Sequence, residues 1–318
     1  MTGPAPLRAL GGTGLAVSAL TLGGAPLGSM PESFGYEVGE QDAVDLVRAV
    51  LRSGIRTIDT ANGYSEGRSE QRIGRALREE DGLPADALVV TKVDARDGDY
   101  SGDRVRRSLE ESRARLGLET LPLVHLHDPE FHDFATMTAP GGAVDALVDA
   151  RERGQVAHIG LAGGDVHQLR RYLDLGVFEV LLVHNRWTLV DRSAGPLIEE
   201  AAARGLGVMN AAVLGGGILT GTRRTSDRYG YRTAPRAVLH AVDRMHDVCR
   251  THGTDLGTAA IRFSTREPRI HTTVVGISKQ QRIAPTLAAS TADLPEVFWD
   301  ELEAMLPSPQ HWLDAGAR

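Results

Sequence analysis

Cysteine is nearly absent from this sequence, because Cys249 is the only one in 318 residues. A disulfide within the chain is therefore excluded, and the helical pattern around Cys249 favours a structural role over a catalytic one. Metal-ligand spacing is missing as well, since His125 and His127 have no third ligand of the expected kind nearby. We therefore expect no zinc site.

Long apolar runs and an excess of positive charge are also absent. No apolar stretch approaches the ~20 residues that span a bilayer, and the amino terminus lacks a basic segment followed by an apolar core. Lys and Arg number 35 against 42 Asp and Glu, for a net charge of −7, which argues against a nucleic-acid partner. The sequence therefore predicts a cytoplasmic protein that acts on small molecules, away from membranes.

Strand and helix signals alternate along the chain, which is typical of a parallel sheet wrapped by helices. Helical patterns occupy residues 42–52 and 196–204, and residues 7–18 carry turn glycines between two short β-like pieces, which predicts a hairpin. One domain spanning residues 1–318 is the simplest count for this length. Strands are expected to begin near Leu20, Arg56, Leu88, Leu121, Val156, Val180, Gly207 and Thr272.

Polar side chains stand at the ends of three successive predicted strands. Asp59 ends one apolar run and precedes Tyr64 in a loop, Lys92 lies inside the next run, and His127 ends the third. Because a buried ammonium needs a counter-charge, Lys92 and Asp59 are predicted to form an ion pair. The usual pKa of tyrosine is about 10, so a cation such as Lys92 would stabilise its phenolate, while a neutral His127 would donate a hydrogen bond. Together the four side chains predict a proton-transfer site for a carbonyl or an alcohol.

The motifs around these residues resemble the aldo-keto reductase superfamily in order and spacing. The similarity implies a (β/α)8 TIM barrel with an N-terminal β-hairpin that closes its bottom. It also implies that Tyr64 donates or accepts the proton, that Lys92 tunes the pKa of Tyr64, that Asp59 holds Lys92, and that His127 orients the substrate. The matching segments are residues 54–61, Tyr64, and residues 69–77, 91–93, 126–129, 154–160, 215–220 and 275–279.

A long loop is expected between strands seven and eight of this barrel. The gap runs from Thr220 to His271 and contains a polar segment at residues 222–236, followed by one or two helices. We interpret the polar segment as a mobile lid over the site. A solvated insertion without a function is the alternative.

The sequence carries no Gly-x-Gly-x-x-Gly pattern after its first strand, which disfavours a Rossmann dinucleotide site. Barrels instead bind phosphate with the loops after strands seven and eight and a helix N-terminus. The resemblance implies a nicotinamide cofactor, NADP or NAD, in those loops. Lys279 and Arg282 are able to pair with a 2′-phosphate, which would favour NADP over NAD. The alternative is that these two cations contact the pyrophosphate or solvent. The cofactor-binding candidates are Gly163, His184, Asn210, Leu214, Gly215, Gly217, Gly276, Ser278, Lys279 and Arg282.

Several positions depart from the commonest pattern of the superfamily. Ala162-Gly163-Gly164 replaces a Ser-Asn pair that binds the nicotinamide carboxamide, and His184 replaces a glutamine. Ala211 stands in place of a tyrosine that stacks on the nicotinamide ring, and Trp187 is the candidate to fill that space. Asp128 and Trp187 are the candidate substrate contacts, and polar neighbours favour a polyhydroxylated substrate. Each of these side chains has a supporting or packing role as its alternative.

The motif combination looks most like a branch that contains L-fucose or D-threo-aldose 1-dehydrogenase, L-galactose dehydrogenase and pyridoxal 4-dehydrogenase. This resemblance implies oxidation of a cyclic hemiacetal to a lactone, with Tyr64 as the base. One alternative is an NADPH-dependent reductase of aldehydes or ketones. Another is a non-catalytic or non-redox barrel that binds a nicotinamide cofactor. A monomer, or a weak homo-oligomer, is the expected state.

Overall fold

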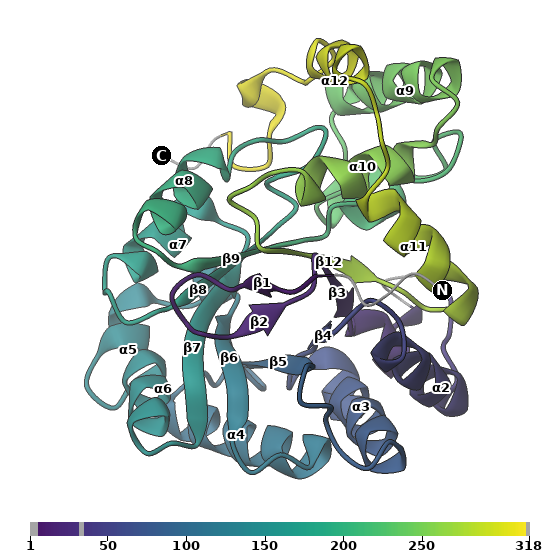
Figure 1. The fold of residues 1–318 in the computed structure, drawn as a ribbon. Helices are drawn as coiled ribbons and strands as arrows, with labels where there is room; N and C mark the ends of the chain where they lie inside the picture. The colour runs from purple at the N-terminus through teal and green to yellow at the C-terminus, as the bar shows by residue number, and fades with distance from the viewer. Residues whose placement is uncertain (1–5, 32–34, 316–318) are drawn as a thin grey trace.

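The computed structural model describes residues 6–31 and 35–315, and its centre is a closed barrel of parallel strands (Figure 1). The strand order around the barrel is β12-β3-β4-β5-β6-β7-β8-β9. Each strand begins at the predicted residue or next to it, so the predicted (β/α)8 barrel is confirmed. The strands are β3 (Leu20–Gly23), β4 (Thr57–Asp59), β5 (Leu88–Val93), β6 (Leu121–His127), β7 (Val156–Gly163), β8 (Val180–His184), β9 (Gly207–Ala211) and β12 (Thr272–Gly276).

Helices follow the strands and cover the outside of the barrel (Figure 1). Side chains alternate between the two faces of a strand, and both faces are buried here, which explains the near-continuous apolar runs. Leu22, Ile58 and Val124 face outward and pack with the helices in one large apolar cluster. The helices are α2 (Glu40–Leu51), α3 (Arg68–Glu79), α4 (Gly102–Leu116), α5 (Phe134–Thr138), α6 (Ala143–Glu152), α7 (Val166–Leu173), α8 (Gly195–Ala203), α9 (Arg236–Thr251), α10 (Leu256–Thr265), α11 (Ile283–Ser290) and α12 (Glu296–Glu303).

The predicted hairpin is present as β1 (Arg8–Ala9) and β2 (Ala16–Val17), which pair antiparallel. Leu10 and Val17 are fully buried in the cluster that fills the barrel interior, beside Leu88 and Val180, the first residues of β5 and β8. A Cβ on Gly207 would lie 2.6 Å from Cγ of Leu10, so glycine makes room for this plug. The hairpin therefore closes the end of the barrel at which the strands begin, as expected.

The start of α3 is joined to the barrel through Ser69. The helix begins at Arg68, after Gly67 in a left-handed conformation (φ 88°). The Ser69 hydroxyl lies 2.9 Å from Oγ1 of Thr60 and donates to the carbonyl of Gly24 at 2.8 Å. Ser69 thus joins α3 to the segments that follow β3 and β4.

The long segment between β9 and β12 holds more structure than a polar loop. It contains a short turn, η4 (Gly215–Gly217), then a hairpin of β10 (Arg228–Tyr229) and β11 (Arg232–Thr233), then α9 and α10. Figure 1 shows α9 beside α12 at one edge of the barrel. Within the described residues, no helix combines the length and apolarity needed to cross a membrane.

Candidate active site

Four polar side chains meet at the end of the barrel where the strands finish. Leu88 and Val90 of β5 point into the barrel, and alternation therefore directs Lys92 inward as well. The same alternation on β6 points Leu123 and His127 inward. Asp59 ends β4, and Tyr64 begins the turn η2 (Tyr64–Gly67) that follows it. The C-terminal ends of barrel strands are where this fold places its active sites.

Lys92 and Asp59 form the predicted ion pair. Nζ of Lys92 lies 2.7 Å from Oδ2 of Asp59, and the two side chains are only 2% and 4% exposed. The same ammonium donates to the carbonyl of Thr60 at 2.7 Å and to the hydroxyl of Tyr64 at 3.3 Å. The three N–H groups of Lys92 are thereby satisfied, which compensates for the cost of burying the ammonium.

The turn that carries Tyr64 has a strained backbone. Ser65 and Glu66 have φ values of 51° and 58°, and Gly67 follows with a φ of 88°. Non-glycine residues in this region cost of order 1–3 kcal/mol each and cluster at functional sites. Here the sharp turn holds the phenol of Tyr64 beside Lys92 and 5.7 Å, ring to ring, from His127.

The pKa of Tyr64 moves in the direction opposite to the sequence-based expectation. Burial raises the pKa of Tyr64 well above its usual value, and the negative charge of Asp59 adds to the rise, with further contributions from Asp128 and Asp94. Lys92 does not reverse this, because Asp59 neutralises its charge at 2.7 Å. In this state Tyr64 remains a protonated phenol at neutral pH.

His127 also differs from the neutral donor that we expected. Burial lowers the pKa of His127, but Asp94 and Asp128 raise it by more, and the net shift is upward. Nδ1 of His127 lies 2.6 Å from Oδ1 of Asp94, and Nε2 lies 3.8 Å from Oδ2 of Asp128. The two carboxylates therefore favour the charged imidazolium. Asp94 was missed in the sequence, although a carboxylate directly after a predicted strand is the same signal that identified Asp59.

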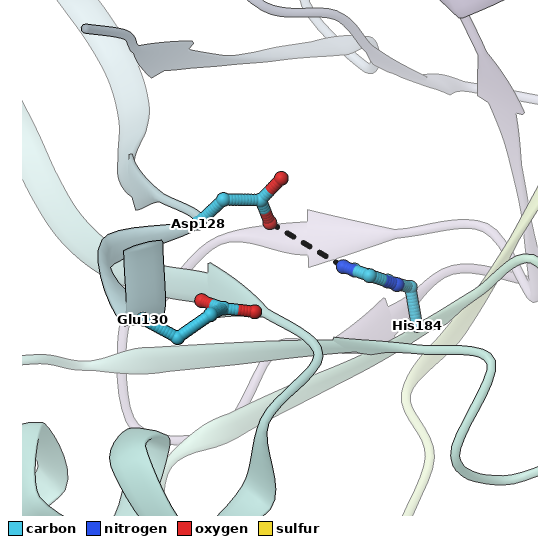
Figure 2. Close-up of side chains that lie close together, drawn as sticks. All are labelled: Asp128, Glu130 and His184. Atoms are coloured by element: carbon cyan, nitrogen blue, oxygen red, sulfur yellow. Dashed lines mark hydrogen bonds and ion pairs between the residues drawn. The ribbon is translucent and has the colours of Figure 1, made fainter. Parts of the chain in front are cut away.

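Asp128, Glu130 and His184 form a second polar group beside His127 (Figure 2). Nε2 of His184 lies 3.3 Å from Oδ1 of Asp128, and one ligand atom from each of the three residues falls within 4.8 Å of the others. Such a set is able to hold a cation. Oε1 of Glu130, however, already accepts the backbone N–H groups of Gly164 and Asp165, at 2.6 and 3.1 Å. Oε1 therefore serves the loop after β7, while Oε2 is buried without a hydrogen-bond partner among the described residues, and we assign no metal to the group.

An open groove of about 800 Å³ fits the expected cofactor. It runs along the ends of β9 and β12 to the start of α11, where a helix N-terminus and two cations favour an anion. The groove also carries Tyr36, Glu37 and Asp255 on its walls. Five of the cofactor-binding candidates line it: Leu214, Gly276, Ser278, Lys279 and Arg282.

The remaining cofactor candidates lie outside the lining of that groove. Gly163 ends β7, and a Cβ there would lie 2.5 Å from Oε2 of Glu130, so close packing explains this glycine. Gly217 has open space where a Cβ would stand, whereas a Cβ on Gly215 would meet Tyr229 at 2.9 Å. His184 pairs with Asp128 at the barrel mouth.

Asn210 and Trp187 lie on the helix side of the barrel, which corrects their expected roles. Met209 points into the barrel, so Asn210 points outward, and its amide donates to the Trp187 carbonyl and to Oγ of Ser264, both at 2.9 Å. The Trp187 ring lies 5.6 Å from the ring of Phe263 on α10. Both side chains are used in packing rather than at the mouth.

The segment predicted as a lid reaches the mouth through two tyrosines. Tyr229 is buried and donates to the carbonyl of Asn185, which anchors the β10–β11 hairpin after β8. Tyr231 lies at the tip of the hairpin with a φ of 66°, is 71% exposed, and stands 6.2 Å, ring to ring, from His184. The sequence analysis missed Tyr231, because nothing periodic marks a hairpin tip within a polar insertion. Its placement agrees with a lid, whose mobility stays a prediction.

Together these groups can move a proton at one oxygen of a small molecule. A protonated phenol and an imidazolium face the barrel mouth, and each can donate a hydrogen bond to a carbonyl oxygen or to a developing alkoxide. The ammonium of Lys92 acts from behind, through its hydrogen bond to the phenol. Beside His127, Asp128 and His184 offer hydrogen-bonding atoms to further hydroxyl groups.

Comparison with known proteins agrees with this geometry. The chain is 30% identical to the pyridoxal 4-dehydrogenase of Microbacterium luteolum over an alignment that covers 93% of this chain and 96% of the relative. It is 31% identical to the L-galactose dehydrogenase of Arabidopsis thaliana, with 94% of each chain covered. Both names belong to the branch that the motifs resemble.

A solved structure supports the fold independently. The aldo-keto reductase AKR11C1 from Bacillus halodurans, in its holo form, superposes with a TM-score of 0.80 at 19% identity, covering 98% of this chain and 99% of that one. In addition, the model of the Aldo/keto reductase family matches residues 19–307. The chain therefore belongs to the aldo/keto reductase family, whose members are oxidoreductases that use a nicotinamide cofactor on small carbonyl compounds.

Proposed function

We propose that this chain oxidises a cyclic hemiacetal to a lactone, with NADP or NAD as the oxidant. The substrate is an aldose of the L-fucose, D-threo-aldose or L-galactose type, or pyridoxal. The observation that carries the proposal is the cluster of Tyr64, Lys92 and His127, with Nζ of Lys92 3.3 Å from the phenol, at the mouth of a barrel that has relatives named for these activities.

The proton steps follow from the positions of these side chains. The anomeric hydroxyl lies between Tyr64 and His127. Because burial raises the pKa of Tyr64, the phenol first has to release its own proton to solvent; the phenolate then takes the hydroxyl proton on Oη while the C–O bond becomes a carbonyl. The oxidised nicotinamide supplies the acceptor for the hydride that leaves the same carbon. Lys92 stabilises the phenolate, and Asp59 keeps Lys92 in place at 2.7 Å. The hemiacetal thus loses a hydride to the oxidised cofactor and a proton to Tyr64, and a lactone and the reduced cofactor result, so atoms and charge balance.

The cofactor is proposed to lie along the groove from Leu214 to Arg282. Lys279 and Arg282 would hold its phosphates there, and a 2′-phosphate between them would favour NADP over NAD. Backbone N–H groups at the start of α11 would add a favourable dipole.

The polar wall of the mouth favours a substrate with several hydroxyl groups. The carboxylate of Asp128 is an acceptor for hydroxyl protons, and its pKa lies below the usual value because His127 and His184 outweigh the effect of burial. It therefore stays ionised at neutral pH. His184 is bonded to it at 3.3 Å and fixes its direction.

A second candidate is reduction of an aldehyde or ketone with NADPH. The raised pKa of Tyr64 favours it, because a phenol that stays protonated at neutral pH is ready to donate to a carbonyl oxygen. The same residues serve both directions, and the supply of oxidised or reduced cofactor decides between them. A non-catalytic barrel that binds the cofactor is the remaining alternative, and it would need none of the buried charges around Tyr64.

One spectrophotometric experiment tests these candidates. Purified protein is mixed with NAD or NADP and a panel of aldoses, pyridoxal and simple alcohols, and the absorbance of reduced nicotinamide is followed. A rise with L-fucose, L-galactose or pyridoxal would support the dehydrogenase. Consumption of NADPH with aldehydes alone would favour the reductase, and silence in both directions would leave the non-catalytic barrel.

A further inference from the structure

Asp94 connects the two residues on which the proton transfer depends. It directly follows β5, and its side chain is 17% exposed. Oδ1 lies 2.6 Å from Nδ1 of His127, and Oδ2 accepts the backbone N–H of Gly63 at 2.6 Å. Because Gly63 immediately precedes Tyr64, one carboxylate holds both the imidazole and the turn that carries the phenol.

The fit around this carboxylate is close. A Cβ on Gly63 would lie 2.9 Å from Cγ of Asp94, a distance that Cβ atoms essentially never show, so glycine is needed for the hydrogen bond. The backbone N–H of Asp94 donates to Oγ of Ser108 on α4 at 3.3 Å, which fixes the backbone that carries the carboxylate. The carboxylate is therefore held by two hydrogen bonds, and its backbone by a third.

We propose that Asp94 is a positioning residue of the active site, which orients His127 and holds the turn of Tyr64. It keeps His127 as an imidazolium whose Nδ1–H points to the carboxylate and whose Nε2–H points to the reacting oxygen. The statement about the reacting oxygen rests on the proposed function. The orientation of His127 does not. An imidazolium next to the oxygen stabilises a developing alkoxide more strongly than a neutral ring, because a charged donor forms the stronger hydrogen bond.

The surroundings of His127 are consistent with a retained proton. The groups that face it carry charges of both signs, and Lys92 is the cation that opposes protonation. His125 adds no charge, because burial holds its pKa well below the usual value. The titratable groups in question are Asp59 on β4, Tyr64 on η2, Lys92 and Asp94 on β5 and just beyond it, Tyr100 before α4, His125 and Asp128 on β6 and just beyond it, and His184 on β8. Burial raises the pKa of Tyr100 well above its usual value, so it adds no charge.

The test is Asp94→Asn, with Asp97→Asn as the matched control. An amide has one accepting atom, so it cannot accept from both His127 and Gly63. Asp97 lies in the same loop, is exposed, and loses the same charge. NMR of the imidazole nitrogens, assigned with His127→Gln, reports the pKa and tautomer of His127 without a substrate. In Asp94→Asn we expect the pKa of His127 to fall by about one unit or more, whereas Asp97→Asn should leave it unchanged.

A second variant and a second measurement guard against a purely structural effect. Gly63→Ala should displace Asp94 and lower the pKa of His127 in the same direction. In turnover assays, the part of the pH–rate profile that reports the titration of His127 should shift in both variants, in step with the His127 pKa measured by NMR. An unaltered His127 pKa and tautomer in Asp94→Asn would overturn the proposal, even if the variant melts at a lower temperature. Absence of turnover in the wild-type protein would count against the proposed function alone, because the NMR result needs no substrate.

Discussion

The ammonium of Lys92 lies 2.7 Å from the carboxylate of Asp59 within the barrel, where both side chains are almost completely buried. Replacing Lys92 by Met should leave Asp59 as a buried, unpaired carboxylate, which costs about 3–5 kcal/mol of stability. Urea unfolding of the single variant and of Lys92→Met/Asp59→Asn measures this cost. The double variant should regain much of the stability and none of the turnover. Equal stability of the single variant and the wild type would contradict the ion pair.

Tyr64→Phe removes the phenol that moves the proton. We expect turnover to vanish while cofactor binding, measured by fluorescence titration, changes little, because the groove proposed for the cofactor does not include Tyr64. Stability should change by no more than about 1 kcal/mol, since the single hydrogen bond lost is a weak one. Unchanged turnover in this variant would refute the role of Tyr64 in either direction of the reaction.

The charged form of His127 should make stability depend on pH. The folded-state pKa of His127 is raised, so its contribution is fully present below the unfolded value of about 6.5 and is lost as pH rises through the folded-state value. The difference in free energy of unfolding between the wild type and His127→Gln should therefore be larger at acidic pH than at alkaline pH. A difference that grows with pH would mean that His127 is neutral in the fold.

Lys279 and Arg282 should matter more for NADP than for NAD. Replacing Arg282 by Ala would remove the proposed charged contact with the 2′-phosphate, and we expect the affinity for NADP to fall about tenfold, which corresponds to about 1.4 kcal/mol. Calorimetric titration with both cofactors measures this. Arg266→Ala, on the opposite side of α10 in a separate pocket, is the control. An equal loss for NADP and NAD would place the cations on the pyrophosphate instead.

Tyr231 should affect substrate binding more than chemistry. Its exposed ring stands over His184 at the mouth, so Tyr231→Ala should raise KM while kcat stays close to that of the wild type. Tyr231→Phe keeps the ring and should behave like the wild type if the ring face makes the contact. Equal kinetic constants for all three proteins would show that the hairpin tip does not touch the substrate.

The sequence was sufficient for the barrel and for the four polar residues at its mouth. Strand positions follow from apolar runs that are buried on both faces. A polar group ends two of these runs, at Asp59 and His127, and Lys92 lies within a third. The order and spacing of the motifs then identified Tyr64 and Lys92 as members of the same site. These signals are local, and tertiary contacts do not alter them.

Other features depend on contacts that no local pattern contains. The charge of His127 depends on Asp94 from another strand, and the raised pKa of Tyr64 depends on how completely the fold buries it. Asn210 was misplaced because the sequence does not show which residues of β9 face inward. Once Met209 is known to point into the barrel, the outward direction of Asn210 follows from alternation.

The proton-transfer residues and the hairpin tip come from different sets of neighbouring strands, here called arcs of the barrel, and this has a consequence for laboratory evolution. Proton-transfer residues come from β4, β5 and β6, whereas the hairpin tip and the wall of His184 come from the far side, after β8 and β9. Randomising the hairpin residues around Tyr231, while keeping His184 because it pairs with Asp128 beside His127, should therefore alter which molecules are accepted without disturbing the buried charges that carry out the reaction. A library confined to that arc should retain folded, cofactor-binding members at a much higher frequency than one directed at the β4–β6 arc.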